Sequence, residues 1–309
     1  GGGLMATARV LLFGASGFLG RAAAEALAGD PRVGSLIRAG RGEPVDESWV
    51  RHDLVTGTMD ELARLLRATQ PTIVINCTGR LSGDTVQLVE ANVLVTARLL
   101  KAVATVVPTA RIVVLGSAAE YGVVPFGKPV AEDDPTNPIG EYGATRLAST
   151  QLVRLAAAHG RLDAVALRVF NPIGPGLPAE TLLGRAVAQI RVALERGDDH
   201  IRLGPLDTYR DFVDVRDVAV AIRAAALAAQ VRNPVLNVGS GVAAATRDAV
   251  ALLAEVAGFT GRVLESALAP ARSRGVNWIA ADLTKINYTI GWAPTYDLRA
   301  SVRASWEQW

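Results

Sequence analysis

The sequence predicts an α/β fold in which a doubly wound parallel sheet is joined to a smaller α+β lobe nearer the C-terminus. Three observations support this prediction. Short apolar strand patterns alternate with longer helix patterns as far as Arg168. A glycine-rich turn follows the first strand pattern and opens the first helix pattern. Beyond Asn171 the alternation becomes irregular and proline-rich, which indicates a second structural part.

The alternation defines the predicted elements in order. Runs of Val, Ile and Leu predict strands over residues 9–13, 33–38, 72–76, 111–115 and 163–168. Segments rich in Ala and Leu predict helices over 18–27, 59–68, 85–106 and 142–159. Strands in such an order pair in parallel, so ligands bind beyond their carboxyl ends. Gly14, Asn76, Ser117 and Asn171 stand at or just beyond those ends.

The second half is predicted less regularly. A loop rich in Pro and Gly begins at Pro172, and helices follow over 181–196 and 215–230, with strands over 201–203 and 235–238. We expect a main domain of residues 5–171 together with about 213–240. The smaller lobe is then expected to contain residues from about 172–212 and from about 241–309.

Composition excludes several classes of protein. The 309 residues carry a net charge of +2 and no basic run, which argues against nucleic-acid binding. The mean hydropathy of +0.26 comes from many short segments, and no stretch is long enough to span a membrane. A single cysteine, Cys77, and the lack of a signal-peptide pattern predict a cytoplasmic protein. Three scattered histidines give no metal-ligand spacing, so no metal is expected.

The glycine-rich turn predicts that the main domain is a Rossmann-like dinucleotide-binding domain. Its GxxGxxG spacing permits a tight turn and close approach of a pyrophosphate to the helix N-terminus. The turn residues expected to contact the cofactor are Gly14, Ser16, Gly17, Phe18, Leu19 and Gly20.

The end of the second strand favours NADP(H), with NAD(H) still possible. NAD-binding proteins place an acidic residue there to bind the ribose 2′-hydroxyl, whereas this chain has Arg38 and Arg41. An arginine side chain can bind a 2′-phosphate by donating hydrogen bonds to it. Arg38 and Arg41 could instead both be solvated surface residues. Asp53 is expected on the adenine side. Further cofactor-binding candidates are Leu54, Cys77, Thr78, Gly79 and Phe170.

A tyrosine and an arginine indicate the chemistry. Tyr142 and Arg146 stand four residues apart on a predicted helix, so their side chains share one face. A fixed positive charge beside a phenol favours the phenolate and prepares it for proton transfer. Ser117 follows a strand upstream, and the three residues together indicate redox chemistry at a carbonyl or carbinol carbon.

Across nearly its whole length the chain resembles the extended short-chain dehydrogenase/reductase family, which includes nucleotide-sugar epimerases, dehydratases and reductases. Residues 168–217 are most similar to GDP-4-keto-6-deoxy-mannose reductases and related deoxysugar 4-ketoreductases. The resemblance rests on the turn from Gly14 to Gly20, Asn92, and the motifs SAAEYG at 117–122, YGATR at 142–146, RVFNPIGP at 168–175, YRDFVDV at 209–215, NVGSG at 237–241 and ADLTK at 281–285.

The resemblance implies a role for each matching residue. Tyr142 would be the general acid/base, Ser117 would hydrogen-bond the reacting oxygen, and residue 146 would hold the nicotinamide ribose. Asn171 and Arg210 would meet a substrate diphosphate, and Arg272 or Arg274 would add a contact. Arg80 is a further substrate candidate, and Asn92 would support the backbone. Structural alternatives exist: Ser117 could cap a turn, Tyr142 could be a packed helix residue, and Arg210 could pair with Asp207 or Asp211.

Two departures from the family pattern narrow the function. Sugar dehydratases carry an acidic pair just after the serine or threonine, where this chain has Ala118 and Ala119, and alanine transfers no proton. Strand-like alternation should turn the next residue, Glu120, to the other face. Arg146 replaces the usual lysine: it keeps the charge but cannot relay protons, since it does not deprotonate.

We therefore expect NADPH-dependent reduction of the 4-keto group of an NDP-4-keto-6-deoxyhexose. Three alternatives remain: an NAD-dependent nucleotide-sugar epimerase, a reductase of a non-sugar ketone in secondary metabolism, and a non-catalytic dinucleotide sensor. The resemblance also implies a homodimer formed by the helices over 85–106 and 142–159.

Overall fold

The computed structural model describes residues 7–265 and 275–309. Its main element is a seven-stranded parallel sheet with the order β10-β6-β5-β4-β1-β2-β3. The strands are β1 (Ala8–Phe13), β2 (Val33–Gly40), β3 (Trp49–Arg51), β4 (Ile73–Asn76), β5 (Arg111–Ser117), β6 (Asp163–Val169) and β10 (Val235–Val238). The strand order steps outward in both directions from β1 and β4, as a doubly wound sheet requires.

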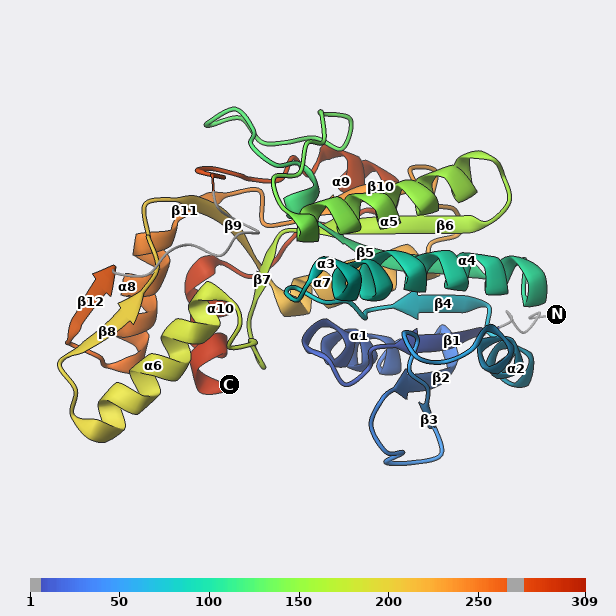
Figure 1. The fold of residues 1–309 in the computed structure, drawn as a ribbon, viewed down its shortest axis with the longest axis horizontal. Coiled ribbons are helices and arrows are strands. Elements are labelled where there is room, and N and C mark those ends of the chain that lie inside the picture. The colour runs from blue at the N-terminus through green and yellow to red at the C-terminus, as the bar shows by residue number, and fades with distance from the viewer. Residues whose placement is uncertain (1–6, 266–274) are drawn as a thin grey trace.

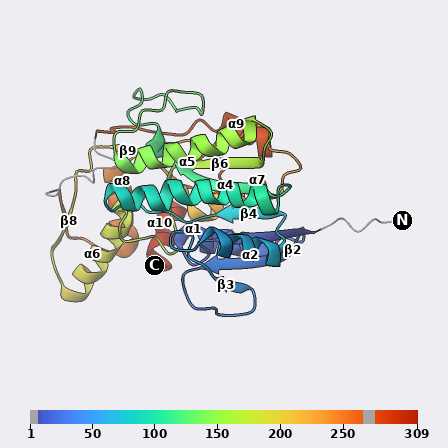
Figure 2. The ribbon, with the colours of Figure 1, turned by 45° about the vertical axis from the view of Figure 1, so that its right-hand side comes forward.

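Helices cover both faces of this sheet (Figures 1 and 2). The helices α1 (Phe18–Ala28) and α7 (Val215–Leu227) pack on one face, and α2 (Met59–Thr69), α4 (Val95–Val106) and α5 (Glu141–Ala158) pack on the other. Alternation along the strands explains this arrangement. In β1, Val10 and Leu12 join the core beneath α1 and α7, while Leu11 and Phe13 join the core beneath α2 and α4.

The second part of the molecule contains two smaller sheets. One has the order β11-β9-β7 and the other pairs β12 with β8. A separate apolar core packs them with α6, α8 and α10. The elements are β7 (Asn171–Ile173), α6 (Leu182–Arg196), β8 (His200–Leu203), β9 (Tyr209–Asp214), β11 (Ala243–Ala245), α8 (Thr246–Ala257), β12 (Arg262–Glu265) and α10 (Leu298–Glu307). Helix α9 (Thr284–Ile290) instead packs on the main sheet, because Ile286 belongs to the core beneath α1 and α7.

The predicted fold class is confirmed, while several elements differ from the prediction. The helix predicted over 85–106 is α3 (Thr85–Val89), a π-helical turn (Glu90–Leu94) and α4 in succession. The loop predicted from Pro172 begins within the short strand β7, which pairs with β9. β9 itself was not predicted, because Arg210, Asp211 and Asp214 interrupt its apolar pattern. The division into domains at residues 171, 213 and 240 stays a prediction.

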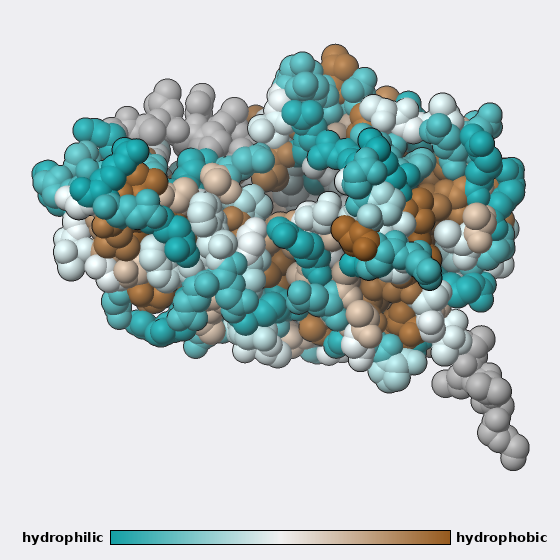
Figure 3. All heavy atoms as spheres, turned by 90° about the horizontal axis from the view of Figure 1, so that it is seen from below, coloured by the Kyte–Doolittle hydropathy of each residue, from teal (hydrophilic) through white to brown (hydrophobic). Residues whose placement is uncertain are grey.

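Within residues 7–265 and 275–309, no helix is both long and apolar enough to cross a membrane. The face drawn in Figure 3 is mostly hydrophilic, with apolar side chains scattered between polar ones. The same face is hollowed near the middle of the molecule.

Candidate active site

A cleft of about 1190 Å³ lies beyond the carboxyl ends of the parallel strands. Loops after β1, β4 and β5 line one side, while residues of α6 and β9 line the other. Pockets for one small ligand usually measure about 300–1,000 Å³. The cleft is therefore large enough for a dinucleotide and a second ligand together.

The glycine turn forms the floor of this cleft. Gly14 has φ of +75°, and a Cβ there would lie 2.8 Å from the Cys77 carbonyl carbon. Gly17 caps α1 without a side-chain acceptor, so no side chain occupies the first amides of the helix. Gly14, Ser16, Gly17, Phe18 and Leu19 line the cleft, and their contact with a cofactor stays a prediction. Gly20 instead packs α1 against the turn, since a Cβ there would lie 1.8 Å from the Gly14 oxygen.

The two predicted arginines at the second strand have different surroundings. Arg41 is exposed and lines the cleft together with Asp53 and Leu54. Arg38 is not among the lining residues. Its guanidinium pairs with Asp46, donates to Ser48 Oγ at 3.0 Å and lies 5.8 Å from the centre of the Trp49 ring. In this structure the loop that follows β2 engages the Arg38 guanidinium, and contact of Arg38 with the cofactor stays a prediction.

His52 lines the cleft beside Asp53 and was not predicted. Its ring packs edge-on against Phe13 with 5.9 Å between the ring centres. Burial lowers the pKa of His52, which favours a neutral imidazole at neutral pH. The only sequence signal for this residue is its position next to Asp53.

Ser117 ends β5 and lines the cleft. Its Oγ accepts the Ala119 amide hydrogen at 3.1 Å, and its own amide donates to Glu120 Oε2 at 2.8 Å. Ser117 thus caps the short 3₁₀ turn over residues 118–120, as one alternative expected, and also faces the cleft. Because Oγ already accepts a bond from the backbone, the hydroxyl hydrogen can be donated to a ligand.

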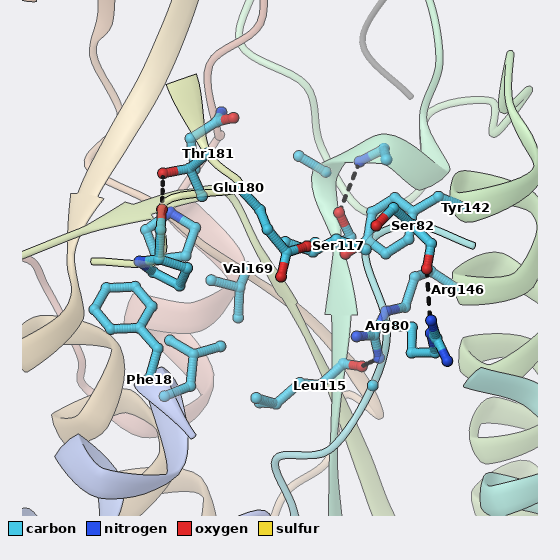
Figure 4. Close-up of a pocket in the computed structure, with 18 of the residues that line it drawn as sticks. Phe18, Arg80, Ser82, Leu115, Ser117, Tyr142, Arg146, Val169, Glu180 and Thr181 are labelled. Atoms are coloured by element: carbon cyan, nitrogen blue, oxygen red, sulfur yellow. Dashed lines mark hydrogen bonds between the residues drawn. The ribbon is translucent and has the colours of Figure 1, made fainter. Parts of the chain in front are cut away.

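Tyr142 and Arg146 lie one turn apart near the start of α5, and both line the cleft (Figure 4). The Arg146 guanidinium carbon is 5.6 Å from the Tyr142 ring centre, and Nη1 donates to the Leu115 carbonyl at 3.1 Å. Gly79 makes room for this side chain, since a Cβ there would lie 2.1 Å from Nη2. Arg146 Nε is buried and has no partner within the described residues. A buried donor of this kind fits an oxygen of a bound cofactor.

Glu120 turns away from the cleft as expected, but the cause is a 3₁₀ turn and not the alternation of a strand. Ala118 and Ala119 line the cleft, whereas Glu120 does not. Glu120 is turned inward because residues 118–120 form a 3₁₀ turn, not a continued strand. Its carboxylate is buried against Arg168, with 2.9 Å between Oε1 and Nε. No carboxylate from this segment therefore faces the cleft.

The residues predicted to meet a substrate lie on the opposite side. Asn171 lines the cleft and donates from Nδ2 to the Asp211 carbonyl at 3.3 Å. Arg210 lines it too, and burial lowers the pKa of its guanidinium to about 10, so the side chain stays cationic at neutral pH. The Asp211 carboxylate accepts amide hydrogens from Ser240 and Ala281 at 2.7 and 3.0 Å.

Other predicted residues are placed as follows. Arg80 lines the cleft, and its Nε donates to the Ser82 carbonyl at 3.2 Å. Cys77, Thr78, Gly79 and Phe170 also line it. Burial raises the pKa of the Cys77 thiol to about 12, so this residue is not a nucleophile at neutral pH. Arg272 and Arg274 lie outside the described residues.

Residues at the start of α6 form a wall that sequence reasoning missed. Glu180, Thr181 and Arg185 line the cleft, and Glu180 points into the cavity toward Ser117 in Figure 4. Their only sequence signal is that they directly follow the predicted Pro- and Gly-rich loop. Among residues 7–265 and 275–309, no group of three or more His, Cys, Asp and Glu side chains could hold a metal ion.

Comparisons with known proteins agree with this geometry. A profile of the NAD dependent epimerase/dehydratase family matches residues 10–239. A dTDP-6-deoxy-L-talose 4-dehydrogenase (NAD(P)(+)) of Kitasatospora kifunensis is 38% identical, over 97% of this chain and 95% of the relative. A UDP-glucose 4-epimerase of Azospirillum brasilense is 30% identical, over 98% and 93%. The RMD of Pseudomonas aeruginosa, solved in complex with NADPH, is 25% identical with a TM-score of 0.82 and covers 98% of this chain and 99% of its own.

Proposed function

The chain belongs to the NAD dependent epimerase/dehydratase family, and we propose that it reduces the 4-keto group of an NDP-4-keto-6-deoxyhexose with NADPH. One observation carries the proposal. Ser117 and Tyr142 line the same cleft, while the positions after Ser117 that hold acids in dehydratases are Ala118 and Ala119. The cleft thus keeps the residues for proton transfer at a carbonyl oxygen, while the two positions that carry the dehydratase acids hold alanine.

The dinucleotide would bind on the β1 side of the cleft. The turn from Gly14 to Gly20 would hold its pyrophosphate, and Arg146 Nε would donate to a ribose oxygen. When bound, the nicotinamide supplies the hydride for the reduction. Arg41 supports NADPH over NADH because its guanidinium faces the cleft where NAD-binding proteins place an acid. The Kitasatospora relative is named for both cofactors, and the Pseudomonas structure contains NADPH.

Side chains of this chain would then act on the sugar carbonyl. Ser117 would donate its hydroxyl hydrogen to the oxygen and polarise the bond, since its Oγ already accepts from Ala119. Tyr142 would transfer its phenolic proton to the same oxygen as the alcohol forms. Arg146 would keep a positive charge beside the phenolate that results.

The substrate nucleotide would lie on the β9 side. Arg210 would bind the diphosphate by charge-assisted hydrogen bonds, and Asn171 would donate to it. We extend the proposal to Arg272 or Arg274 as a further diphosphate contact, on the family resemblance alone. The name of the Kitasatospora relative, a dTDP-6-deoxy-L-talose 4-dehydrogenase, supports a deoxysugar substrate with reaction at C4.

The test is incubation of the pure protein with NADPH and dTDP- and GDP-linked 4-keto-6-deoxyhexoses. Oxidation of one NADPH for each sugar reduced is the expected result. If neither nucleotide series oxidises NADPH while the protein binds the cofactor, reduction of a nucleotide sugar is the wrong function.

Epimerisation is the second candidate, because Ser117 and Tyr142 would serve it equally and the Azospirillum relative is a UDP-glucose 4-epimerase. It predicts tightly bound NAD+ that copurifies and no net consumption of cofactor. Mass spectrometry of the protein as purified separates the two candidates.

We also propose that the protein is a homodimer. Leu94 beside α4 and Leu155 on α5 are exposed apolar side chains on the helices expected at the interface. Light scattering that gives the mass of one chain would exclude this assembly.

A further inference from the structure

A buried ion pair lies beneath the end of β5. Glu120 has no exposed surface and Arg168 on β6 is 3% exposed, with 2.9 Å between Glu120 Oε1 and Arg168 Nε. Buried charges are costly unless they are paired and further hydrogen-bonded. Neither residue lines the large cleft, so the proposed reaction does not account for the pair directly.

The second oxygen of the Glu120 carboxylate joins two parts of the site. Glu120 Oε2 accepts the amide hydrogen of Ser117 at 2.8 Å and the hydroxyl hydrogen of Thr150 at 3.0 Å. Thr150 is 1% exposed and lies on α5, about two turns after Tyr142. One atom therefore connects the backbone of Ser117 to the helix that carries Tyr142.

Neighbouring residues fit closely around this connection. A Cβ on Gly116 would lie 2.4 Å from Glu120 Oε2 and 2.9 Å from Thr150 Oγ1, so a glycine is needed beneath the bond. On the far side, Arg168 Nη1 donates to the Tyr121 hydroxyl at 3.0 Å, and that hydroxyl donates to Asn237 at 2.5 Å. Arg168 on β6 therefore holds the Glu120 carboxylate on one side, and Asn237 on β10 supports Arg168 through Tyr121. On its other side the carboxylate bonds Ser117 and α5.

We infer that Glu120 is a positioning residue, whose carboxylate sets the spacing between Ser117 and Tyr142. The inference rests on the proposed function, since it assigns both side chains to one reaction. Ser117 comes from a strand and Tyr142 from a helix, and a long loop separates them in the sequence. Catalytic side chains must be held to within about 0.5 Å, so a fixed connection between strand and helix is required.

The test removes the connection but keeps the ion pair. Thr150→Val deletes the hydroxyl bonded to Glu120 with little change of shape, and leaves Arg168 paired. Thr96→Val is the matched control: Thr96 is 2% exposed, and its hydroxyl bonds Ser149 on the same helix at 2.6 Å, without a link to Ser117. Thr150→Ser keeps the hydroxyl and should restore the parent behaviour.

For reduction of the 4-keto sugar, we expect Thr150→Val to lower kcat about tenfold, since a displacement of 1 Å can cost about a hundredfold. KM for the sugar and the Kd for NADPH should stay within twofold, because their proposed contacts are unchanged. Equal losses of kcat in Thr150→Val and Thr96→Val would overturn the inference, as would full activity in both.

A second measurement does not depend on turnover. Crystal structures with NADPH can be compared for the parent, Thr150→Val and Thr96→Val. The separation between Ser117 and Tyr142 should shift by about 0.5 Å or more in Thr150→Val alone. An unchanged separation in Thr150→Val contradicts the positioning role even if no sugar is reduced. A parent without turnover but with the expected shift in Thr150→Val would instead reject the proposed function and keep the positioning role.

Discussion

Replacing Gly79 by alanine tests how Arg146 is placed. The Arg146 guanidinium lies against Gly79, and an alanine Cβ would stand 2.1 Å from Nη2 and 2.8 Å from the guanidinium carbon. The arginine must retreat by about 1.3 Å to restore an ordinary contact of about 3.4 Å. That shift breaks the 3.1 Å bond from Nη1 to the Leu115 carbonyl. Gly79→Ala therefore moves the guanidinium without removing its charge.

The expected loss follows from the contacts of Arg146. A hydrogen bond from a charged donor contributes about 1.5–3 kcal/mol. Loss of one such bond to the cofactor, at the lower end of that range, corresponds to about a tenfold weaker Kd. We expect Gly79→Ala to raise the Kd for NADPH by about this factor and to lower kcat, because the guanidinium is displaced relative to Tyr142.

Isothermal titration with NADPH measures the effect. Gly127→Ala is the control for backbone strain: Gly127 has φ of +79°, and a Cβ there would meet nothing within 4 Å. A Kd for Gly79→Ala within twofold of the Gly127→Ala value would refute the placement of Arg146 at the cofactor.

Three further outcomes are expected. Arg41→Ala should raise KM for NADPH about tenfold and leave KM for NADH unchanged, as steady-state kinetics with both cofactors would show. Glu120→Gln should lower the free energy of unfolding by about 3–5 kcal/mol in urea denaturation, because it leaves the Arg168 charge buried and unpaired. Burial raises the pKa of Glu132 to about 7, and its Oε2 lacks a partner among the described residues. Glu132 is protonated at low pH in both the folded and the unfolded chain and then costs no stability. As pH rises from 4.5 to about 7, the unfolded chain releases this proton more readily, so the free energy of unfolding falls. After screening by solvent, the buried charge costs about 1 kcal/mol of unfolding free energy. Glu132→Gln should therefore raise Tm by about 2–4 °C at pH 8. At pH 4 the variant should melt at the same temperature as the parent.

Much of the fold could be predicted because its signals are local. The parallel sheet follows from apolar runs that alternate with helix patterns, and the turn from Gly14 to Gly20 carries its own spacing. Strand β9 escaped prediction because its polar residues are buried by partners far away in the sequence. Asp211, for example, bonds the amides of Ser240 and Ala281.

The candidate site shows the same limit. Ser117, Tyr142 and Asn171 could be placed because parallel strands bring their carboxyl ends to one edge. Arg38 could not be placed, since its engagement by Asp46 and Trp49 depends on the conformation of a loop. Glu180 carries no local pattern that distinguishes it from a surface carboxylate.

In the proposed reaction NADPH supplies a hydride to C4 of the sugar, and Tyr142 supplies the proton to the carbonyl oxygen. One turnover with NADPH doubly deuterated at nicotinamide C4 and a dTDP-4-keto-6-deoxyhexose measures this transfer. We expect one deuterium at C4 of the product sugar, and in Tyr142→Phe a rate at least about a hundredfold lower at unchanged NADPH affinity. A product without deuterium, or a Tyr142→Phe variant as fast as the parent, would contradict it.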